Sequence, residues 1–279
     1  MLDQEGNVTH IIGIKKDISE RLLSEEAHEN SLRIESENRE LQRLASARSE
    51  FLSTVSDELR TPLTTVSAFA NILFNSKSEN LTERQREHIE LIRKSSTQIG
   101  SLIDDLLDIS QADTGHLVLN KAVFNVSYMI DEVASNAEVL FAHREQKFKF
   151  KNKAKKRGLL ADRSRVIQIL TNLFTNASKF SDEGSTINFQ VEIKREQVIF
   201  TVKDRGAGIS KSDQAMMFSP FFRGMSESSV PPDGRGLGLA VVRSLVDLHD
   251  GTIVVNSKSD KGTEITVSLP GVTPDALED

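Results

Sequence analysis

Two asparagines and a lysine share one face of the segment 162–180, which has the apolar spacing of an amphipathic helix. Asn172 and Asn176 stand four positions apart and Lys179 follows three positions later, so a helix places their side chains together. Amide oxygens suit a magnesium ion that shares phosphate oxygens, and a nearby ammonium group neutralises phosphate charge. The alternative interpretation is an ordinary polar helix face.

A second candidate site follows a predicted strand. It reads Asp204-Arg205-Gly206-Ala207-Gly208-Ile209. A carboxylate at the end of a strand accepts the exocyclic amine of adenine but repels the carbonyl oxygen of guanine, so it selects ATP over GTP. The glycines let the backbone approach the ring. Taken alone, the same residues also fit a plain turn.

A third motif is rich in glycine and precedes a predicted helix. It reads Gly234-Arg235-Gly236-Leu237-Gly238-Leu239. Its backbone amides and the helix N-terminus suit phosphate groups, and its glycine intervals differ from those of the dinucleotide fingerprint. Phe218-Ser219-Pro220-Phe221-Phe222-Arg223 and the polar stretch 224–233 lie between the two glycine motifs. We expect a lid over a nucleotide here, with phenylalanines that pack in the core or anchor its hinge.

In their order along the chain, these motifs resemble the N, G1, F, G2 and G3 boxes of the histidine-kinase ATPase superfamily, with Gly262-Thr263 as the last box. The resemblance covers residues 48 to 270. It implies ATP and magnesium as cofactors, with Asn176 on the metal, Asn172 beside it and Lys179 near phosphate. It also implies Asp204 on adenine and Thr263 in support of the adenine pocket. The other nucleotide-binding positions that it implies are Phe180, Gly206, Gly208, Ile209, Arg223, Gly234, Arg235, Gly236, Leu237, Gly238 and Leu239.

The segment Ser56-Asp57-Glu58-Leu59-Arg60-Thr61-Pro62-Leu63 resembles the phosphoacceptor box of a sensor histidine kinase that lacks its histidine. Asp57 takes the acceptor position, and a carboxylate would form a labile acyl phosphate in place of a phosphoramidate. The resemblance implies that Glu58 is the base for the acceptor and that Thr61 positions water for dephosphorylation of the partner. We therefore predict that ATP binding is kept and autophosphorylation is lost. An engineered replacement and a naturally degenerate kinase both fit Asp57.

Three functions follow from the resemblance. The first is an ATP-dependent protein-histidine kinase, a transferase that passes phosphate to an aspartate of a response-regulator receiver domain, here in a form without its acceptor. The second is a phosphatase or a regulator-binding scaffold that uses Thr61. The third is a nucleotide-driven conformational module, which the phosphoacceptor box and the heptad spacing argue against.

Two predicted helices carry the phosphoacceptor box. Helix-forming residues run from Ser19 to Ser76 with Pro62 as the only proline, which is expected to bend the helix. Apolar residues at heptad spacing predict a parallel coiled coil or a lone solvated helix, and they are Ile34, Leu41, Leu44, Phe51 and Val55. Thr82 and Gln85 predict a capping box for a second helix that ends at residues 113–115. Two such hairpins would form a dimeric four-helix bundle, so we expect a homodimer.

The rest of the chain alternates between helix and strand signals. Helices are predicted at 126–142, 162–180 and 239–249, and strands with period-two alternation at 187–193, 198–202 and 265–269. Strands with one apolar face and helices to cover it predict a two-layer α+β sandwich of the GHKL ATPase type. At the start of the chain, residues 6–14 predict a strand, and Asp17-Ile18-Ser19-Glu20-Arg21 resembles the exit motif of a PAS sensor domain.

These patterns predict five parts of the chain. They are the C-terminal strand of a truncated PAS domain at 1–18, a coiled-coil linker at 19–47, the dimerisation and phosphoacceptor hairpin at 48–115, the ATP-binding domain at 120–272 and a tail at 273–279.

Composition limits the classes of partner. The net charge of -6 argues against non-specific binding to nucleic acid. The chain has no cysteine, which excludes disulfides and sulfur-ligated zinc. No apolar run approaches the ~20 residues that cross a bilayer, so we expect no membrane contact and a cytoplasmic location for this chain, while a parent protein could still be anchored. His88, His116, His143 and His249 are interpreted as isolated surface histidines without a catalytic part.

Overall fold

The computed structural model describes residues 19–75, 81–154, 158–224 and 236–272. The chain divides into two compact units, 1–47 and 48–279. The predicted strand at 6–14, most of the loop at 75–81 and nearly all of the predicted lid lie outside the described residues. In the first unit, the described residues 19–47 are helical, and the side chains described from residue 30 onward are exposed, including Ile34, Leu41 and Leu44.

A helical hairpin opens the second unit. Helix α1 (Ser19–Asn75) runs through Pro62 without interruption, and α2 is Glu83–Asp113. The side chain of Thr82 accepts from the Gln85 amide and the Gln85 side chain accepts from the Thr82 amide, which confirms the predicted capping box. The two helices pack antiparallel, since Ser49 contacts Thr114 near one end of α2 and the Arg93 guanidinium lies 4.7 Å from the Phe74 ring centroid toward the other.

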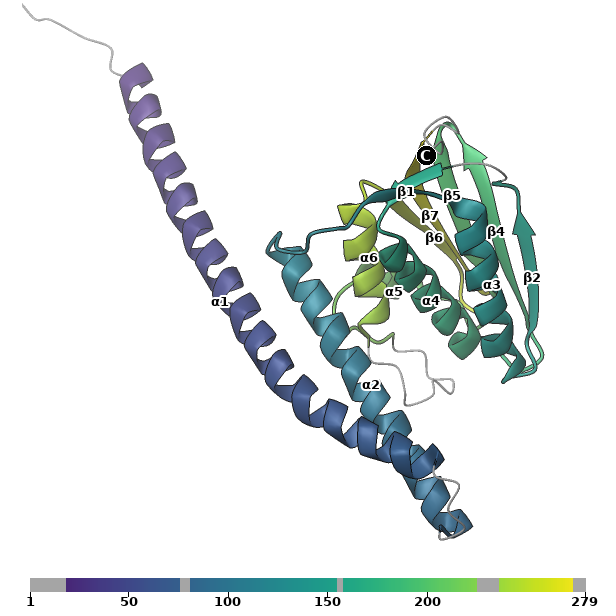
Figure 1. The fold of residues 1–279 in the computed structure, drawn as a ribbon. Coiled ribbons are helices and arrows are strands. Elements are labelled where there is room, and N and C mark those ends of the chain that lie inside the picture. Colours follow the sequence, from purple (N-terminus) through teal and green to yellow (C-terminus); the bar gives the residue numbers. More distant parts are fainter. Residues whose placement is uncertain (1–18, 76–80, 155–157, 225–235, 273–279) are drawn as a thin grey trace, which may run out of the picture. The chain divides into compact units, whose positions relative to one another are not determined.

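The remaining elements form a sheet covered by helices (Figure 1). The strands are β1 (Ala122–Asn125), β2 (Lys147–Asn152), β3 (Gly158–Ala161), β4 (Thr186–Lys194), β5 (Gln197–Lys203), β6 (Thr252–Ser257) and β7 (Thr263–Val272), and the helices are α3 (Val126–Ala142), α4 (Arg163–Phe180), α5 (Lys211–Met216) and α6 (Gly238–Leu248). The strand order is β1-β3-β7-β5-β4-β2, and β6 pairs with β7. The β2–β4 pair is parallel and the other pairs are antiparallel.

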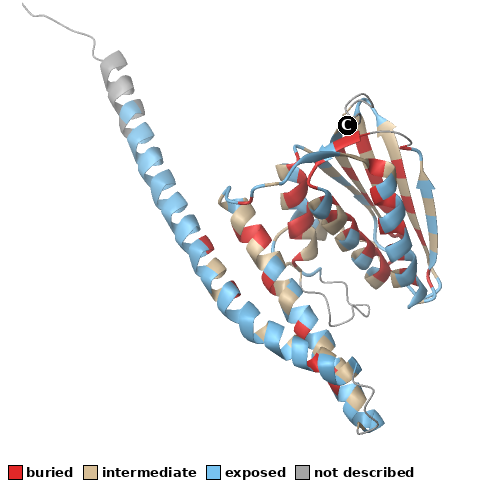
Figure 2. Ribbon diagram, viewed as in Figure 1, coloured by how far each residue is buried: buried red, intermediate tan, exposed pale blue. Residues whose placement is uncertain are grey.

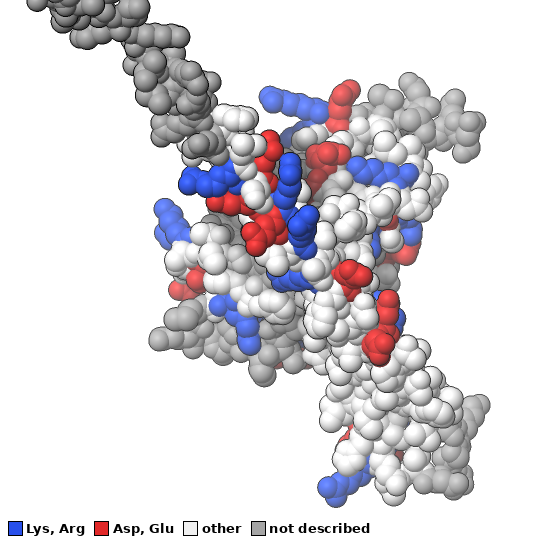
Figure 3. Space-filling view, turned by 90° about the vertical axis from the view of Figure 1, so that its left-hand side faces the viewer, with Lys and Arg blue, Asp and Glu red and all other residues white. Residues whose placement is uncertain are grey.

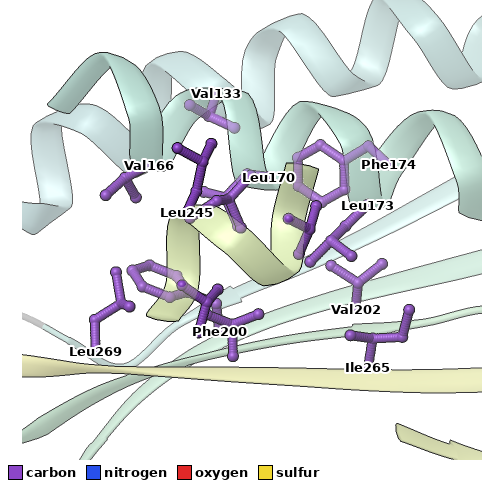
Figure 4. Close-up of a cluster of buried hydrophobic side chains, with 14 of the residues drawn as sticks. Val133, Val166, Leu170, Leu173, Phe174, Phe200, Val202, Leu245, Ile265 and Leu269 are labelled. Carbon is purple, nitrogen blue, oxygen red and sulfur yellow. The ribbon is translucent and has the colours of Figure 1, made fainter. Parts of the chain in front are cut away.

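The hydrophobic core lies between one face of this sheet and α3, α4 and α6 (Figure 4). Strands β4, β5 and β7 each alternate buried apolar residues with half-buried and mainly polar ones, as a sheet with one covered face requires. Figure 2 shows the buried residues gathered along the helices and strands of this domain. The helical hairpin followed by a two-layer ATPase-type domain is the predicted fold.

The predicted helices and three strands are present, but four strands and α5 are absent from the sequence-based prediction. Two of these strands, β1 and β3, have four residues each, too few for a period to be visible. Strand β2 alternates clearly, yet its outward positions are all lysine. Strand β6 places two valines in succession and so lacks a clean alternation.

The surface gives no continuous patch of one charge on the face in Figure 3, where acidic and basic side chains are interspersed. Among the described helices, none combines the length and the apolar character needed to span a bilayer.

Candidate nucleotide-binding and phosphoacceptor sites

Helix α4 presents the two asparagines of the N box to the start of α6. Its N-terminus is fixed by Asp162, whose carboxylate accepts the amides of Ser164 and Arg165. The Asn172 side chain donates weakly to the Gly238 carbonyl at 3.5 Å. A methyl group at Gly238 would lie 3.7 Å from the Asn172 side chain and 3.8 Å from Asn176 Nδ2. The structure therefore brings the predicted N and G2 boxes into contact.

The Asp204 carboxylate lies directly after β5 and is only 8% exposed. Its Oδ1 atom accepts the amides of Gly206 at 2.8 Å and Thr263 at 3.0 Å. Within the described part of the chain, no hydrogen bond reaches Oδ2, which leaves that oxygen as an acceptor. Burial raises the pKa of Asp204 above its usual range, and the two amides offset this shift only in part.

Three glycines allow the backbone segments around Asp204 to touch. A Cβ at Gly206 would lie 1.9 Å from the Phe180 carbonyl oxygen, and one at Gly208 would lie 2.0 Å from the Lys258 carbonyl oxygen. A Cβ at Gly262 would lie 2.3 Å from the Asp204 carbonyl oxygen. Gly208 and Gly262 also have positive φ values of 70° and 83°. Thus the end of α4, the G1 loop (204–209) and the G3 turn (258–263) form one closely packed wall.

The F and G2 boxes also meet. The Phe221 amide donates to the Gly236 carbonyl at 2.9 Å, and a Cβ at Gly236 would lie 2.7 Å from the Phe221 carbonyl carbon. Phe221 is 59% exposed, so this phenylalanine is not a core residue. Leu237 is fully buried and Leu239 packs against the core, which leaves their backbone for contact with a ligand. Gly234 and Arg235 lie outside the described residues.

Four further predicted site residues are Lys179, Phe180, Thr263 and Arg223. The Lys179 ammonium lies 4.9 Å from the centroid of the Phe180 ring, and Phe180 is exposed. Thr263 is half-buried, and its hydroxyl lies 2.9 Å from Ser257 Oγ. Arg223 is exposed, and its side chain makes no hydrogen bond or salt bridge with another described residue.

The phosphoacceptor box lies on an exposed face of α1. The Arg60 guanidinium bonds to Asp57 Oδ1 and to Asp104 Oδ1 of α2, each at 2.9 Å. The hydrogen bond with Asp104 and the two negative charges raise the pKa of Arg60. The Thr61 hydroxyl donates to the Asp57 carbonyl at 3.3 Å, and Glu58 is exposed beside it. Asp57 therefore pairs with Arg60 within α1, and Arg60 in turn joins the two helices of the hairpin through Asp104.

His249 corrects the interpretation of the histidines as surface residues. It is 3% exposed, its Nδ1 donates to the Leu245 carbonyl at 2.7 Å and its Nε2 accepts the Asp162 amide at 3.1 Å. Burial lowers the pKa of His249. For Asp162, which contacts this ring, burial alone would raise the pKa, but hydrogen bonds from Ser164, Asn120 and Arg165 lower it. A helix-end position in the sequence gives no sign of this burial.

Other supporting residues had no signal in the sequence. The Gln146 amide group, between α3 and β2, donates to the Ser178 carbonyl at 2.8 Å and accepts the Ser178 hydroxyl at 2.7 Å, which fixes the end of α4. Asp108 of α2 is buried and accepts from Arg165 at 2.7 Å and Gln168 at 2.8 Å. Long-range pairs of this kind depend on the fold and cannot be read from local spacing.

Two family models match the chain. Residues 47–115 match the His Kinase A (phospho-acceptor) domain, and residues 161–273 match the histidine kinase-, DNA gyrase B-, and HSP90-like ATPase.

Similar proteins include an uncharacterized sensor-like histidine kinase of Rhizobium meliloti, 32% identical over 99% of this chain and 52% of the relative. The circadian input-output histidine kinase CikA of Synechococcus elongatus is 36% identical over 82% of this chain and 30% of its own length. Among solved structures, full-length ShkA in complex with AMPPNP is 29% identical with a TM-score of 0.66, covering 80% of this chain and 46% of that one. The chain thus spans about half or less of the length of these relatives.

Proposed function

Because the chain is homologous to sensor histidine kinases and carries their phospho-acceptor and ATPase domains, we propose that it binds Mg-ATP as the catalytic core of such a kinase. The observation that carries this proposal is the contact of the predicted boxes with one another around Asp204 and Gly238. The nucleotide in the ShkA structure supports the same assignment.

Each predicted residue has a role that its position supports. Asp204 Oδ2 would accept the adenine amine, and Thr263 would hold the carboxylate from the other side through its amide. Asn176 and Asn172 would bind magnesium and its waters next to Gly238, where the lack of a side chain leaves room for phosphate. Magnesium would neutralise phosphate charge. Lys179 would add a positive charge at the same end of α4.

The acceptor position limits what happens to the phosphoryl group. Asp57 is a carboxylate already paired with Arg60, and an acyl phosphate formed there would hydrolyse readily. We therefore propose that this form binds ATP but does not store phosphate. The exposed hairpin would form a homodimer and bind a receiver domain, with residues 19–47 as a coiled-coil linker behind a PAS sensor domain.

A second function is supported by the same box. Glu58 directly follows Asp57, and Thr61 lies one helical turn after it. Both are exposed, so they remain accessible to a partner. This chain would then act on a response regulator as a phosphatase or a binding scaffold. Such a role needs the bundle surface and not a phosphorylated acceptor.

Incubation with ATP labelled at the γ-phosphate separates the two functions. We expect no stable label on the unaltered chain and label on the Asp57→His variant. Asp113→His, at the last residue of α2, serves as a control for a histidine placed elsewhere and should stay unlabelled. If Asp57→His also stays unlabelled while binding ATP, the kinase assignment is wrong and the scaffold function is favoured.

A further inference from the structure

Ser257 lies at the end of β6 and joins the two segments that hold Asp204. Its Oγ atom accepts the Ile209 amide at 2.8 Å and donates to the Gly262 carbonyl at 3.0 Å. The Thr263 hydroxyl, at 2.9 Å, completes its contacts. A serine hydroxyl has one donor and two acceptor sites, so these three partners use its full capacity.

Gln214 of α5 contacts the backbone of the same two residues, Ile209 and Ser257. Its Nε2 group donates to the Ile209 carbonyl at 2.8 Å and to the Ser257 carbonyl at 3.0 Å. Ile209 is thus fixed at its amide by Ser257 and at its carbonyl by Gln214. We call these four hydrogen bonds, from Ser257 and Gln214 to Ile209, Gly262 and the Ser257 backbone, the Ser257 brace.

The Ser257 brace closes the far end of the wall that begins at Asp204. At the near end, the Asp204 carboxylate receives one amide from the G1 loop and one from the G3 turn. The Asp204 amide also donates to the Thr263 carbonyl at 2.9 Å, and the Asp260 amide donates to the Ala207 carbonyl at 2.6 Å. The direction of the carboxylate therefore depends on how the G1 loop and the G3 turn lie relative to each other, which the brace fixes.

We propose that Ser257 and Gln214 are positioning residues for base selection, which hold the G1 loop against the G3 turn so that Asp204 Oδ2 faces the adenine amine. This inference rests on the proposed binding of ATP. Neither side chain needs to touch the nucleotide. Loss of the brace leaves the Ile209 amide without its acceptor and frees the loop, so that Asp204 loses its fixed direction.

The brace predicts a change in selectivity as well as in affinity. The Asp204 carboxylate attracts adenine and repels the guanine carbonyl. A displaced carboxylate therefore weakens ATP binding and repels GTP less. We expect Ser257→Ala to weaken ATP binding about tenfold, the effect of roughly one lost hydrogen bond together with an unsatisfied amide, with little change for GTP.

The experiment measures the affinities of the full chain for ATP and for GTP, by competition with a fluorescent ATP analogue. Ser257→Ala and Gln214→Glu, which lacks the amide donors, should both reduce the preference for ATP, whereas Ser257→Thr keeps the hydroxyl and should restore it. Thr201→Ala is the matched control, since within the described residues this hydroxyl has one hydrogen-bond partner, Thr266 at 3.4 Å. Amide exchange without nucleotide supplies a second readout, and Ser257→Ala should speed exchange at Ile209.

The two proposals fail in different ways. An unaltered chain that binds no nucleotide contradicts the proposed function. An unaltered chain that binds ATP, together with Ser257→Ala and Gln214→Glu variants of unchanged preference, contradicts the brace. Equal losses of affinity for ATP and GTP, together with a lower midpoint of thermal unfolding, also contradict the brace, since they would show a merely stabilising role.

Discussion

The Asp204 carboxylate combines deep burial with hydrogen bonds from two backbone amides. Its raised pKa means that the folded chain binds this proton more tightly than the unfolded chain does. Stability from this group is therefore present at low pH and lost as the pH rises from the usual aspartate pKa through the raised one. Ionisation of Asp204 therefore costs stability, which is common for groups that bind a ligand.

We expect Asp204→Asn to weaken ATP binding by roughly 10- to 100-fold, because it removes a charged acceptor and presents a donor to the adenine amine. The same variant should unfold at an equal or higher temperature at neutral pH, since an amide oxygen still accepts both backbone amides without the buried charge. Nucleotide titration and thermal unfolding check the two effects. A large fall in thermal stability would show that the charge stabilises the fold.

His249 gives a pH dependence of the opposite sign. Its folded pKa is lowered, so the unfolded chain takes up the proton first, near the ordinary value of 6.5. The free energy of unfolding should therefore be fully present above this pH and fall as the pH drops below it. Lys121, Asp162 and Asp250 are the charged groups that act on this ring.

Urea unfolding at a series of pH values tests this assignment. We expect a flatter acid limb for His249→Gln, because glutamine has an oxygen to accept the Asp162 amide and no proton to gain. His143→Gln, at an exposed site after α3, is the control and should keep the slope of the unaltered chain. Identical acid limbs in all three chains would contradict the role of His249.

At the scale of elements, the sequence allows prediction where spacing is local and regular. Helices α2, α3 and α4 follow from the apolar period, and the cap of α2 follows from Thr82 and Gln85. Strand β2 and the brace at Ser257 do not, because a lysine-rich edge and a single serine acquire meaning only from neighbours far away in the chain. The boxes of the site were predicted, whereas the residues that hold them together were not.

The capping box at α2 should matter for stability alone. We expect Thr82→Ala to lower the free energy of unfolding by about 1 kcal/mol, since it leaves the Gln85 amide without its acceptor. Nucleotide affinity should stay unchanged. Thr97→Ala is the control and should have a smaller effect, because in the described part of the chain the Thr97 hydroxyl donates to one group, the Arg93 carbonyl of the same helix. Equal destabilisation by both changes would mean that the cap contributes nothing specific.

At the scale of the whole molecule, the hairpin leaves large apolar side chains exposed. They include Leu59, Val66, Phe69 and Ile72 on α1 and Ile92 and Ile99 on α2. A two-helix hairpin cannot enclose these side chains by itself, which supports the proposed four-helix bundle from two copies.

Light scattering coupled to size exclusion tests this assembly. We expect a dimer for the unaltered chain and a shift to monomer for Phe69→Glu, a residue that is 62% exposed in a single chain. Val139→Glu, an equally exposed apolar site on α3, should remain dimeric. A dimer that survives Phe69→Glu and dissociates with Val139→Glu would place the interface on the ATPase domain.

The account depends most on an intact nucleotide site beside a box whose acceptor position is aspartate. Titration of the unaltered chain with a fluorescent ATP analogue, with and without magnesium, measures this directly. We expect saturable binding that weakens strongly when magnesium is chelated and that unlabelled ATP displaces better than GTP. Absence of saturable, magnesium-dependent binding would contradict the central claim.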